Sequence, residues 1–352
     1  MLVNIENCED LNEAEETKDL LKTYKTKAIK LIEKKCILCD KPITSFCKSH
    51  TVPFSWLKNI DNQQKMLSMY SILDCNWTKQ DRGAKEAGIF YSICETCDHE
   101  VFSHYENKDN YKDEMPTKEM LQEIVLKICV KEIYEHRIAA KQFELLLQDH
   151  ILEDYCEEIL IAEKETLSTT LNELHTFQKK CPDFRIIYFK KLPYKVPIAY
   201  QDQIAVFSDF EGSVINNTYI NSNKIQVLYE SILPFESESI LLLFTLSSNN
   251  RYSKFIRKFT SLSEDNRQRT LLYLMFSYSQ NYFISKQLEQ IIKEDEFVKQ
   301  LAEKLILGIE ESNYKLSRME AHIKATVETM KSFSLEKAFD LKNYLAKDFS
   351  LK

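Results

Sequence analysis

The sequence predicts an α+β fold in which helices predominate. Glycine and proline are rare, with four and seven in 352 residues, so few positions break a helix or form a tight turn. Long segments carry apolar residues at helical spacing, whereas a central block contains short segments rich in β-branched and aromatic residues. These observations predict a small antiparallel sheet at about residues 184–247, preceded and followed by helical segments.

Residues 1–35 are predicted to form an N-terminal helix. Over residues 11–35 the apolar side chains recur at helical spacing, on one stripe made of Leu20, Leu21, Tyr24, Ala28, Leu31 and Ile32. A charged leader with little fixed structure is the alternative. The following segment, 36–115, breaks the helical pattern repeatedly, which predicts a small and irregular module with both tryptophans of the chain.

Residues 116–352 are predicted to form a helical and sheet domain of unknown role. After Pro116 and Thr117, residues 118–180 contain no glycine and no proline. Thr117 is the expected N-cap of the helix that begins there. We therefore expect helices at 117–180, the sheet at about 184–247 and helices at 251–346. No catalytic motif is found here, so this domain is expected to bind a protein partner or to form a homo-oligomer.

Composition and charge restrict the class of protein. The net charge is −7 and the pI about 5.7, which gives no global basic footprint for nucleic acid. The N-terminus is acidic and does not resemble a signal peptide, and the apolar run 240–246 is too short to span a bilayer. We therefore expect a cytoplasmic protein with no membrane association.

Two C-x-x-C pairs predict one structural zinc site. They are Cys36 with Cys39 and Cys94 with Cys97. Each tight turn places two thiolates on one side of a loop, and four thiolates complete a closed tetrahedral site. Two chance pairs, or a redox dithiol, are the alternatives. The remaining cysteines are interpreted as free, core or incidental thiols: Cys8, Cys47, Cys75, Cys129, Cys156 and Cys181.

The sequence between and after these pairs resembles a known family. Ser49-His50-Thr51-Val52-Pro53 gives S-H-x-x-P, and Cys97-Asp98 is followed by F-S-x-Y-E over residues 102–106. This order is similar to that of divergent bacterial HNH endonucleases of the zinc-stabilised ββα-metal type, over about residues 36–112. The resemblance implies an HNH-like, treble-clef zinc module.

By this resemblance the module cleaves phosphodiester bonds of DNA or RNA. His50 would be the general base that activates water, because the pKa of histidine lies near neutral pH. A catalytic Mg²⁺ or Mn²⁺ would stabilise the transition state, with Asp98, His99 and His104 as candidate ligands. On a continuous helix Glu100 and His104 would share one face.

Three positions depart from the family pattern. Ser49 precedes the first histidine, where family members commonly have an acidic residue. Asp98 follows the second pair in place of histidine or asparagine, and remains an acceptable oxygen ligand for Mg²⁺. No asparagine lies shortly before Cys94, so Asp81 or Glu86 would have to substitute.

Each candidate also has a structural interpretation. His50 can cap or cross-link the loop near the zinc, and His99 and His104 can be surface residues. Trp56 and Trp77 are expected to fill a small core rather than to stack on bases. Two basic groups, either solvated faces or phosphate-binding surfaces, stand outside the module: Lys190, Lys191 and Lys195, and Arg251, Lys254, Arg257 and Lys258.

The sequence thus leads to a metal-dependent HNH-type nuclease. Its layout, a nuclease-like module joined to a helical domain, resembles that of bacterial defence effectors. The alternative is a catalytically inactive zinc module that binds protein or nucleic acid. A third interpretation is a purely structural zinc clip on a helical interaction protein.

Overall fold

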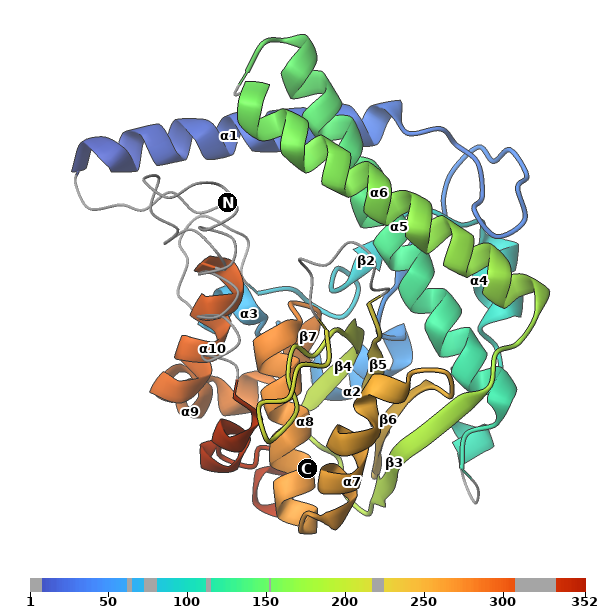
Figure 1. Ribbon diagram of the computed structural model, residues 1–352, viewed down its shortest axis with the longest axis vertical. Coiled ribbons are helices and arrows are strands. Elements are labelled where there is room, and N and C mark those ends of the chain that lie inside the picture. The colour runs from blue at the N-terminus through green and yellow to red at the C-terminus, as the bar shows by residue number, and fades with distance from the viewer. Residues whose placement is uncertain are drawn as a thin grey trace. The chain divides into compact units, whose positions relative to one another are not determined.

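The structure is a computed structural model that describes residues 8–61, 65–72, 81–111, 115–151, 153–216, 225–307 and 334–352 (Figure 1). It confirms a mixed α+β protein, about half helical, with a small antiparallel sheet. The chain divides into two compact units. Residues 1–51 and 89–182 form the first, here called the cysteine unit, and residues 52–88 and 183–352 form the second, the sheet unit. The domain bounds predicted above stay a prediction.

The cysteine unit is built on a pair of long helices. Helix α5, Lys118–Gln148, and helix α6, Glu153–Lys179, pack against each other as a helical hairpin (Figure 1). The Thr117 hydroxyl accepts a hydrogen bond from the Met120 N–H, which confirms the predicted N-cap. The N-terminal helix α1, Cys8–Leu31, packs on α5, where Gln142 donates to the Leu21 carbonyl.

Four short elements lie between α1 and α5 in the described part of this unit. Strand β1, Ser49–His50, pairs antiparallel with strand β2, Ile89–Phe90. Helix α4, Glu95–Val101, follows directly, and the 3₁₀ turn η1, Lys108–Tyr111, comes next. Within this unit a strand pair is thus followed by a helix that begins at the second C-x-x-C pair, and α2 and α3 of the sheet unit lie between the two strands along the chain.

The sheet unit contains five antiparallel strands in the order β3-β6-β5-β4-β7. Their bounds are Phe184–Leu192 for β3, Ile198–Ile204 for β4, Leu228–Pro234 for β5, Ser239–Leu246 for β6 and Tyr282–Ile284 for β7. Strand β7 falls inside the segment predicted to be helical, so that prediction is wrong there. Residues 282–284 pair with β4, and nothing in three residues of sequence reveals a long-range partner. Within the region predicted to form the sheet, about 184–247, the described residues 213–216 form no named strand.

The sheet unit also contains helices: α2, Phe54–Asp61; α3, Met69–Ile72; α7, Ser253–Ser261; α8, Glu264–Tyr278; α9, Glu289–Lys293; and α10, Glu296–Leu307. Of these, α2, α7 and α8 contact strands of the sheet, and α10 packs on α8. Four short 3₁₀ turns complete the described elements: η2, Asn250–Tyr252; η3, Lys286–Leu288; η4, Leu335–Asp340; and η5, Lys347–Phe349. Helix α8 contributes a run of fully buried residues from Leu271 to Phe276, which joins the sheet in one apolar core.

Candidate metal centre and adjoining cleft

The four predicted cysteines converge on one point. The sulfur atoms of Cys36, Cys39, Cys94 and Cys97 all lie within 4.8 Å of one another. The Sγ atoms of Cys39 and Cys94 are 3.9 Å apart. Zinc–sulfur bonds of about 2.3 Å in a tetrahedron require sulfur atoms about 3.8 Å apart. The four cysteines can therefore hold a metal ion such as zinc.

The backbone around each pair explains this convergence. In the first pair, the Asp40 N–H donates to the Cys36 carbonyl at 2.9 Å, and Asp40 takes a positive φ of 61° that closes the tight turn. In the second pair, Cys94 is the N-cap of α4. The backbone N–H of Cys94 donates to the Cys36 sulfur at 3.4 Å, which joins the two turns directly.

The surroundings of the four thiols favour the binding of a cation. Burial opposes ionisation of Cys36, but backbone N–H groups, among them that of Cys94, lower its pKa to about 7. Burial and the neighbouring cysteines raise the pKa of Cys97. Four thiols this close repel one another once ionised, whereas a bound divalent cation stabilises all four thiolates together. This set of sulfur ligands is the kind that zinc prefers.

His50 lies on β1, which precedes α4 in the sequence. It is partly buried, and its register partner on β2 is Ile89. The Cys47 N–H donates to the Ile93 carbonyl at 2.8 Å, and the Ile37 N–H donates to the Ser92 carbonyl at 3.1 Å. These bonds attach residues 92 and 93, which follow β2 and lead into the second cysteine pair, to the segment that carries the first pair and to Cys47.

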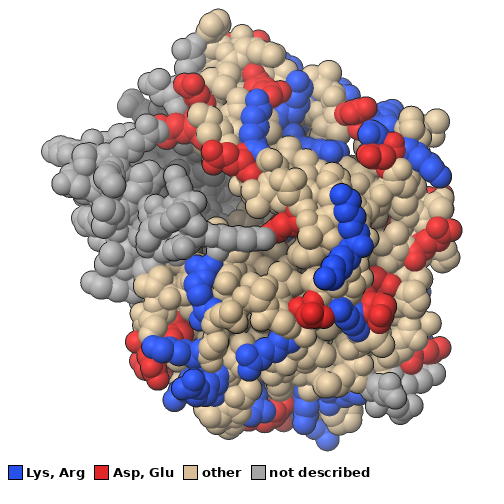
Figure 2. Space-filling model, turned by 45° about the vertical axis from the view of Figure 1, so that its right-hand side comes forward, with Lys and Arg blue, Asp and Glu red and all other residues tan. Residues whose placement is uncertain are grey.

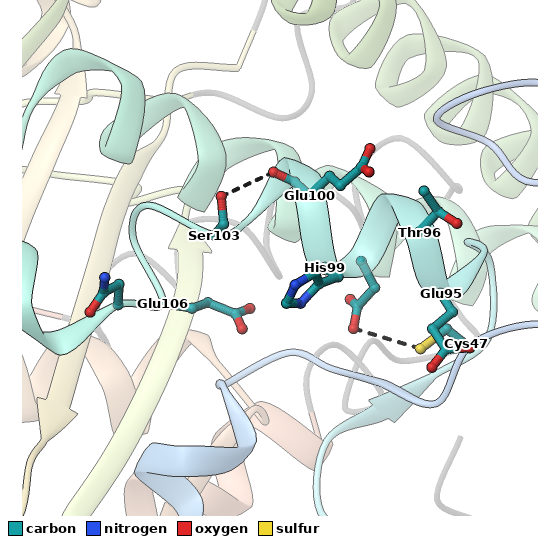
Figure 3. A pocket seen from close by; sticks show the side chains of 9 residues that line it. Cys47, Glu95, Thr96, His99, Glu100, Ser103 and Glu106 are labelled. Carbon is teal, nitrogen blue, oxygen red and sulfur yellow. Dashed lines mark hydrogen bonds between the residues drawn. The ribbon is translucent and has the colours of Figure 1, made fainter.

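An open cleft of about 860 Å³ lies along α4 and the turn after it (Figure 3). Four acidic residues line it together with polar side chains: Cys47, Glu95, Thr96, Asp98, His99, Glu100, Ser103, Glu106 and Asn107. Figure 3 shows the His99 ring and the Glu106 carboxylate turned toward each other, whereas the Glu100 carboxylate points away from both. The predicted ligands Asp98 and His99 therefore reach one cleft.

A buried lysine on α5, Lys127, pairs with two of the acidic residues that line this cleft. The Nζ atom of Lys127 lies 2.9 Å from Asp98 Oδ1 and 2.9 Å from Glu106 Oε1. The other carboxylate oxygen of Asp98 accepts a hydrogen bond from the Cys47 thiol at 3.6 Å. Cys47 is thus outside the four-cysteine cluster, and its thiol instead donates a hydrogen bond to Asp98 beside that cluster.

His104 does not share a helix face with Glu100. Helix α4 ends at Val101, and Phe102 is its C-cap, so the expected four-residue spacing on one helix is wrong. Beyond the helix, Glu123 fixes the turn. Its carboxylate accepts from the backbone N–H of His104 at 3.0 Å and of Tyr105 at 2.9 Å, and lies 2.6 Å from His104 Nδ1. His104 is not among the residues that line the cleft.

The other predicted residues belong to the sheet unit or lie outside the described residues. Trp56 is buried and packs edge-on to Phe235 at 5.9 Å, so it fills a core as expected, but that of the sheet unit. Asp81 pairs with Lys286 at 2.6 Å in the same unit. Glu86 and both basic groups also lie in that unit. Trp77 and Cys75 are outside the described residues.

On the face shown in Figure 2, basic and acidic side chains are interspersed. This visible surface has no extended region of one sign. At the candidate site itself, four acidic side chains line the cleft.

Sequence reasoning did not identify Lys127 and Glu123 as parts of the site. The surrounding residues gave an indication: Glu123 and Lys127 lie in a stretch of α5 in which most of the other residues are apolar and buried. Both charged side chains are themselves buried. Charged residues rarely occur fully buried unless they are paired. A lysine and a glutamate four positions apart inside such a run therefore indicate buried partners elsewhere in the chain.

The chain matches no protein-family model, and no curated protein or solved structure matches it. Within the described residues, every helix is too short or too polar to cross a bilayer.

Proposed function

We propose that the region around the cysteine cluster is a zinc-stabilised module of the HNH, ββα type that hydrolyses phosphodiester bonds of DNA or RNA. The observation that carries this proposal is the antiparallel pairing of β1, which carries His50, with β2, which leads into α4 at the second cysteine pair, although α2 and α3 lie between the two strands along the chain. The closed four-thiolate cluster would be a scaffold, because it leaves no position for water on the metal. Chemistry would then depend on the residues that the cluster holds in place.

In this proposal His50 is the general base. Its imidazole would take a proton from the water that attacks the phosphorus atom, which histidine can do near neutral pH. The zinc cluster and the β1–β2 pairing would fix the backbone that carries the ring. His99, which lines the cleft, is the second candidate for contact with the substrate.

Two of the three ligands expected for a catalytic Mg²⁺ or Mn²⁺, Asp98 and His104, do not fit that role. Asp98 already pairs with Lys127 and accepts from Cys47, and His104 is bound to Glu123. No step of the proposed reaction is therefore assigned to a divalent ion held by these residues.

The second candidate function is binding without catalysis, and one observation favours it. The acidic residues Glu95, Glu100 and Glu106 line the cleft, and such a surface repels the phosphates of nucleic acid. A basic protein segment would complement it electrostatically. In this case the zinc module would have descended from a nuclease, would have lost its catalytic activity and would recognise a protein.

A cleavage assay separates these two functions. We expect the zinc-loaded protein to cleave plasmid DNA or RNA, and His50→Ala to lower the rate at least ~100-fold, the range for loss of a general base. His175→Ala, at an exposed position on α6, is the matched control and should leave the rate unchanged. Equal cleavage by His50→Ala and wild type, with equal zinc content, would refute the mechanism. No cleavage by wild type, with capture of a basic peptide, would favour the second function.

A further inference from the structure

Lys127 is the most deeply buried ion-paired side chain at the cleft. It is 2% exposed, while its partners Asp98 and Glu106 are 25% and 32% exposed. Its Nζ atom also lies 4.2 Å from the centroid of the Phe102 ring, where the ring face attracts a cation. The ammonium group is therefore held from three directions and reaches the cleft only through its two carboxylates.

The two carboxylates come from different parts of the chain. Asp98 lies on α4, and Glu106 lies in the turn that follows it. Both line the cleft, whereas Lys127 enters from α5 and is not a lining residue. Two carboxylates that face one cation are also what a hard divalent ion requires in a protein, together with further oxygen ligands or water.

We propose that Lys127 is the built-in cation of this cleft and occupies the place that a divalent metal ion would take between Asp98 and Glu106. A metal ion could bind there only by displacing the ammonium group, because two cations at one pair of carboxylates repel strongly in a buried environment. Lys127 has almost no exposed surface through which to leave, and Phe102 packs on it. The position between Asp98 and Glu106 is therefore closed to Mg²⁺ and Mn²⁺ in the wild-type chain.

This inference stands apart from the proposed hydrolysis, since it concerns metal binding and requires no substrate. It explains why Asp98 does not act as the metal ligand that the HNH resemblance implies. Asp98 is a suitable oxygen ligand, but Lys127 supplies the positive charge in place of a metal ion. It also implies that removal of the lysine charge should create a metal site. His99 and Asn107 line the same cleft and are ligand types that Mn²⁺ accepts.

The test is a titration of the zinc-loaded, full-length protein with Mn²⁺, followed by the electron paramagnetic resonance signal of free Mn²⁺. We expect Lys127→Met to bind one equivalent of Mn²⁺ with an affinity at least ~10-fold higher than that of wild type, because one like charge is lost. Adding Glu106→Gln to Lys127→Met should abolish the binding. Lys131→Met is the matched control, because Lys131 lies one turn further along α5 and pairs with Glu135 rather than with a residue that lines the cleft.

Two results would overturn the proposal. The first is Mn²⁺ binding by wild type that is lost in Glu106→Gln, which would show that the ammonium does not block the site. The second is a folded Lys127→Met variant, with one equivalent of zinc, that binds no more Mn²⁺ than wild type. If Lys127→Met fails to fold, Lys127→Gln replaces it, and the wild-type and Glu106→Gln titrations decide the first point regardless. None of these outcomes depends on nucleic-acid cleavage, so failure here is distinct from failure of the proposed function.

Discussion

The two units of the molecule bury charge in opposite ways. In the cysteine unit, Lys127 has two carboxylate partners at 2.9 Å, and Glu123 accepts from two backbone N–H groups. In the sheet unit, Glu230 on β5 is fully buried, and neither of its carboxyl oxygens has a hydrogen-bond partner within the described part of the chain. Its register partner on β4 is another acid, Asp202.

The difference shows how each unit is held together. Buried charges that are fully paired stay ionised and tie specific segments to one another. A buried carboxyl without partners instead becomes neutral, and burial raises the pKa of Glu230 well above its ordinary value. The cysteine unit thus contains a four-cysteine cluster that can hold a metal ion, together with buried ion pairs, whereas the sheet unit has an apolar core large enough to tolerate one protonated acid.

The largest expected effect tests whether the metal holds only the cysteine unit. Cys36→Ser should lower bound zinc well below one equivalent and unfold residues 36–51 and 89–111, because structural zinc contributes about 10–16 kcal/mol to folding in small zinc-binding peptides. The strands β5 and β6 should keep their slow hydrogen exchange. Hydrogen–deuterium exchange with mass spectrometry measures both regions in one sample.

Cys181→Ser is the control for this change, because Cys181 lies outside the four-cysteine cluster. It should keep both the zinc and the protection of the cysteine unit. Loss of protection in β5 and β6 to the same extent as around Cys36 would show that the two units do not depend on separate interactions.

The next effect concerns the pH dependence of the sheet unit. The folded state keeps the proton of Glu230 above pH ~4.5, while the unfolded chain releases it, so the folded state binds more protons. Stability contributed by this group is therefore complete below the ordinary carboxyl pKa. It falls as the pH rises toward the raised pKa, by at most about 1.4 kcal/mol per pH unit. Glu230→Gln should remove this part of the slope.

Urea unfolding at several pH values from about 5 to 8, followed by probes in the sheet unit, measures the slope. Glu211→Gln, at an exposed position of the same unit, is the control and should follow wild type. Parallel stability curves for wild type and Glu230→Gln would mean that Glu230 is ionised in the folded protein, and that its carboxylate has a partner after all.

Features set by neighbouring residues could be predicted from the sequence. The spacing of each cysteine pair fixes a tight turn, so the cluster of Cys36, Cys39, Cys94 and Cys97 was predictable, and Thr117 was identifiable as an N-cap from the residues around it. Features set by distant residues were not. The partners of Lys127 depend on how α4 packs against α5, and no local pattern encodes that packing.

The position of His104 shows the same limit at short range. The sequence after α4 contains no glycine or proline to mark the end of the helix, so a continuous helix through residue 104 was the natural expectation. The helix ends at Val101 because Glu123, from α5, captures the backbone N–H groups of His104 and Tyr105. A tertiary contact overrides the local preference, and it removes His104 from the face that Glu100 occupies.

The smallest expected effect sharpens the comparison, because the same local device occurs in both units. Thr117 caps α5 through the Met120 N–H at 3.3 Å, and Ser263 caps α8 through the Asn266 N–H at 3.3 Å. Replacing either residue with alanine should lower stability by about 1 kcal/mol. If the units are stabilised separately, Thr117→Ala should speed hydrogen exchange in α5 alone and Ser263→Ala in α8 alone. Thr176→Ala, at an exposed position in the last turns of α6, should change neither helix. Faster exchange in α8 on loss of the Thr117 cap would instead show that metal-held and apolar regions unfold together as one cooperative structure.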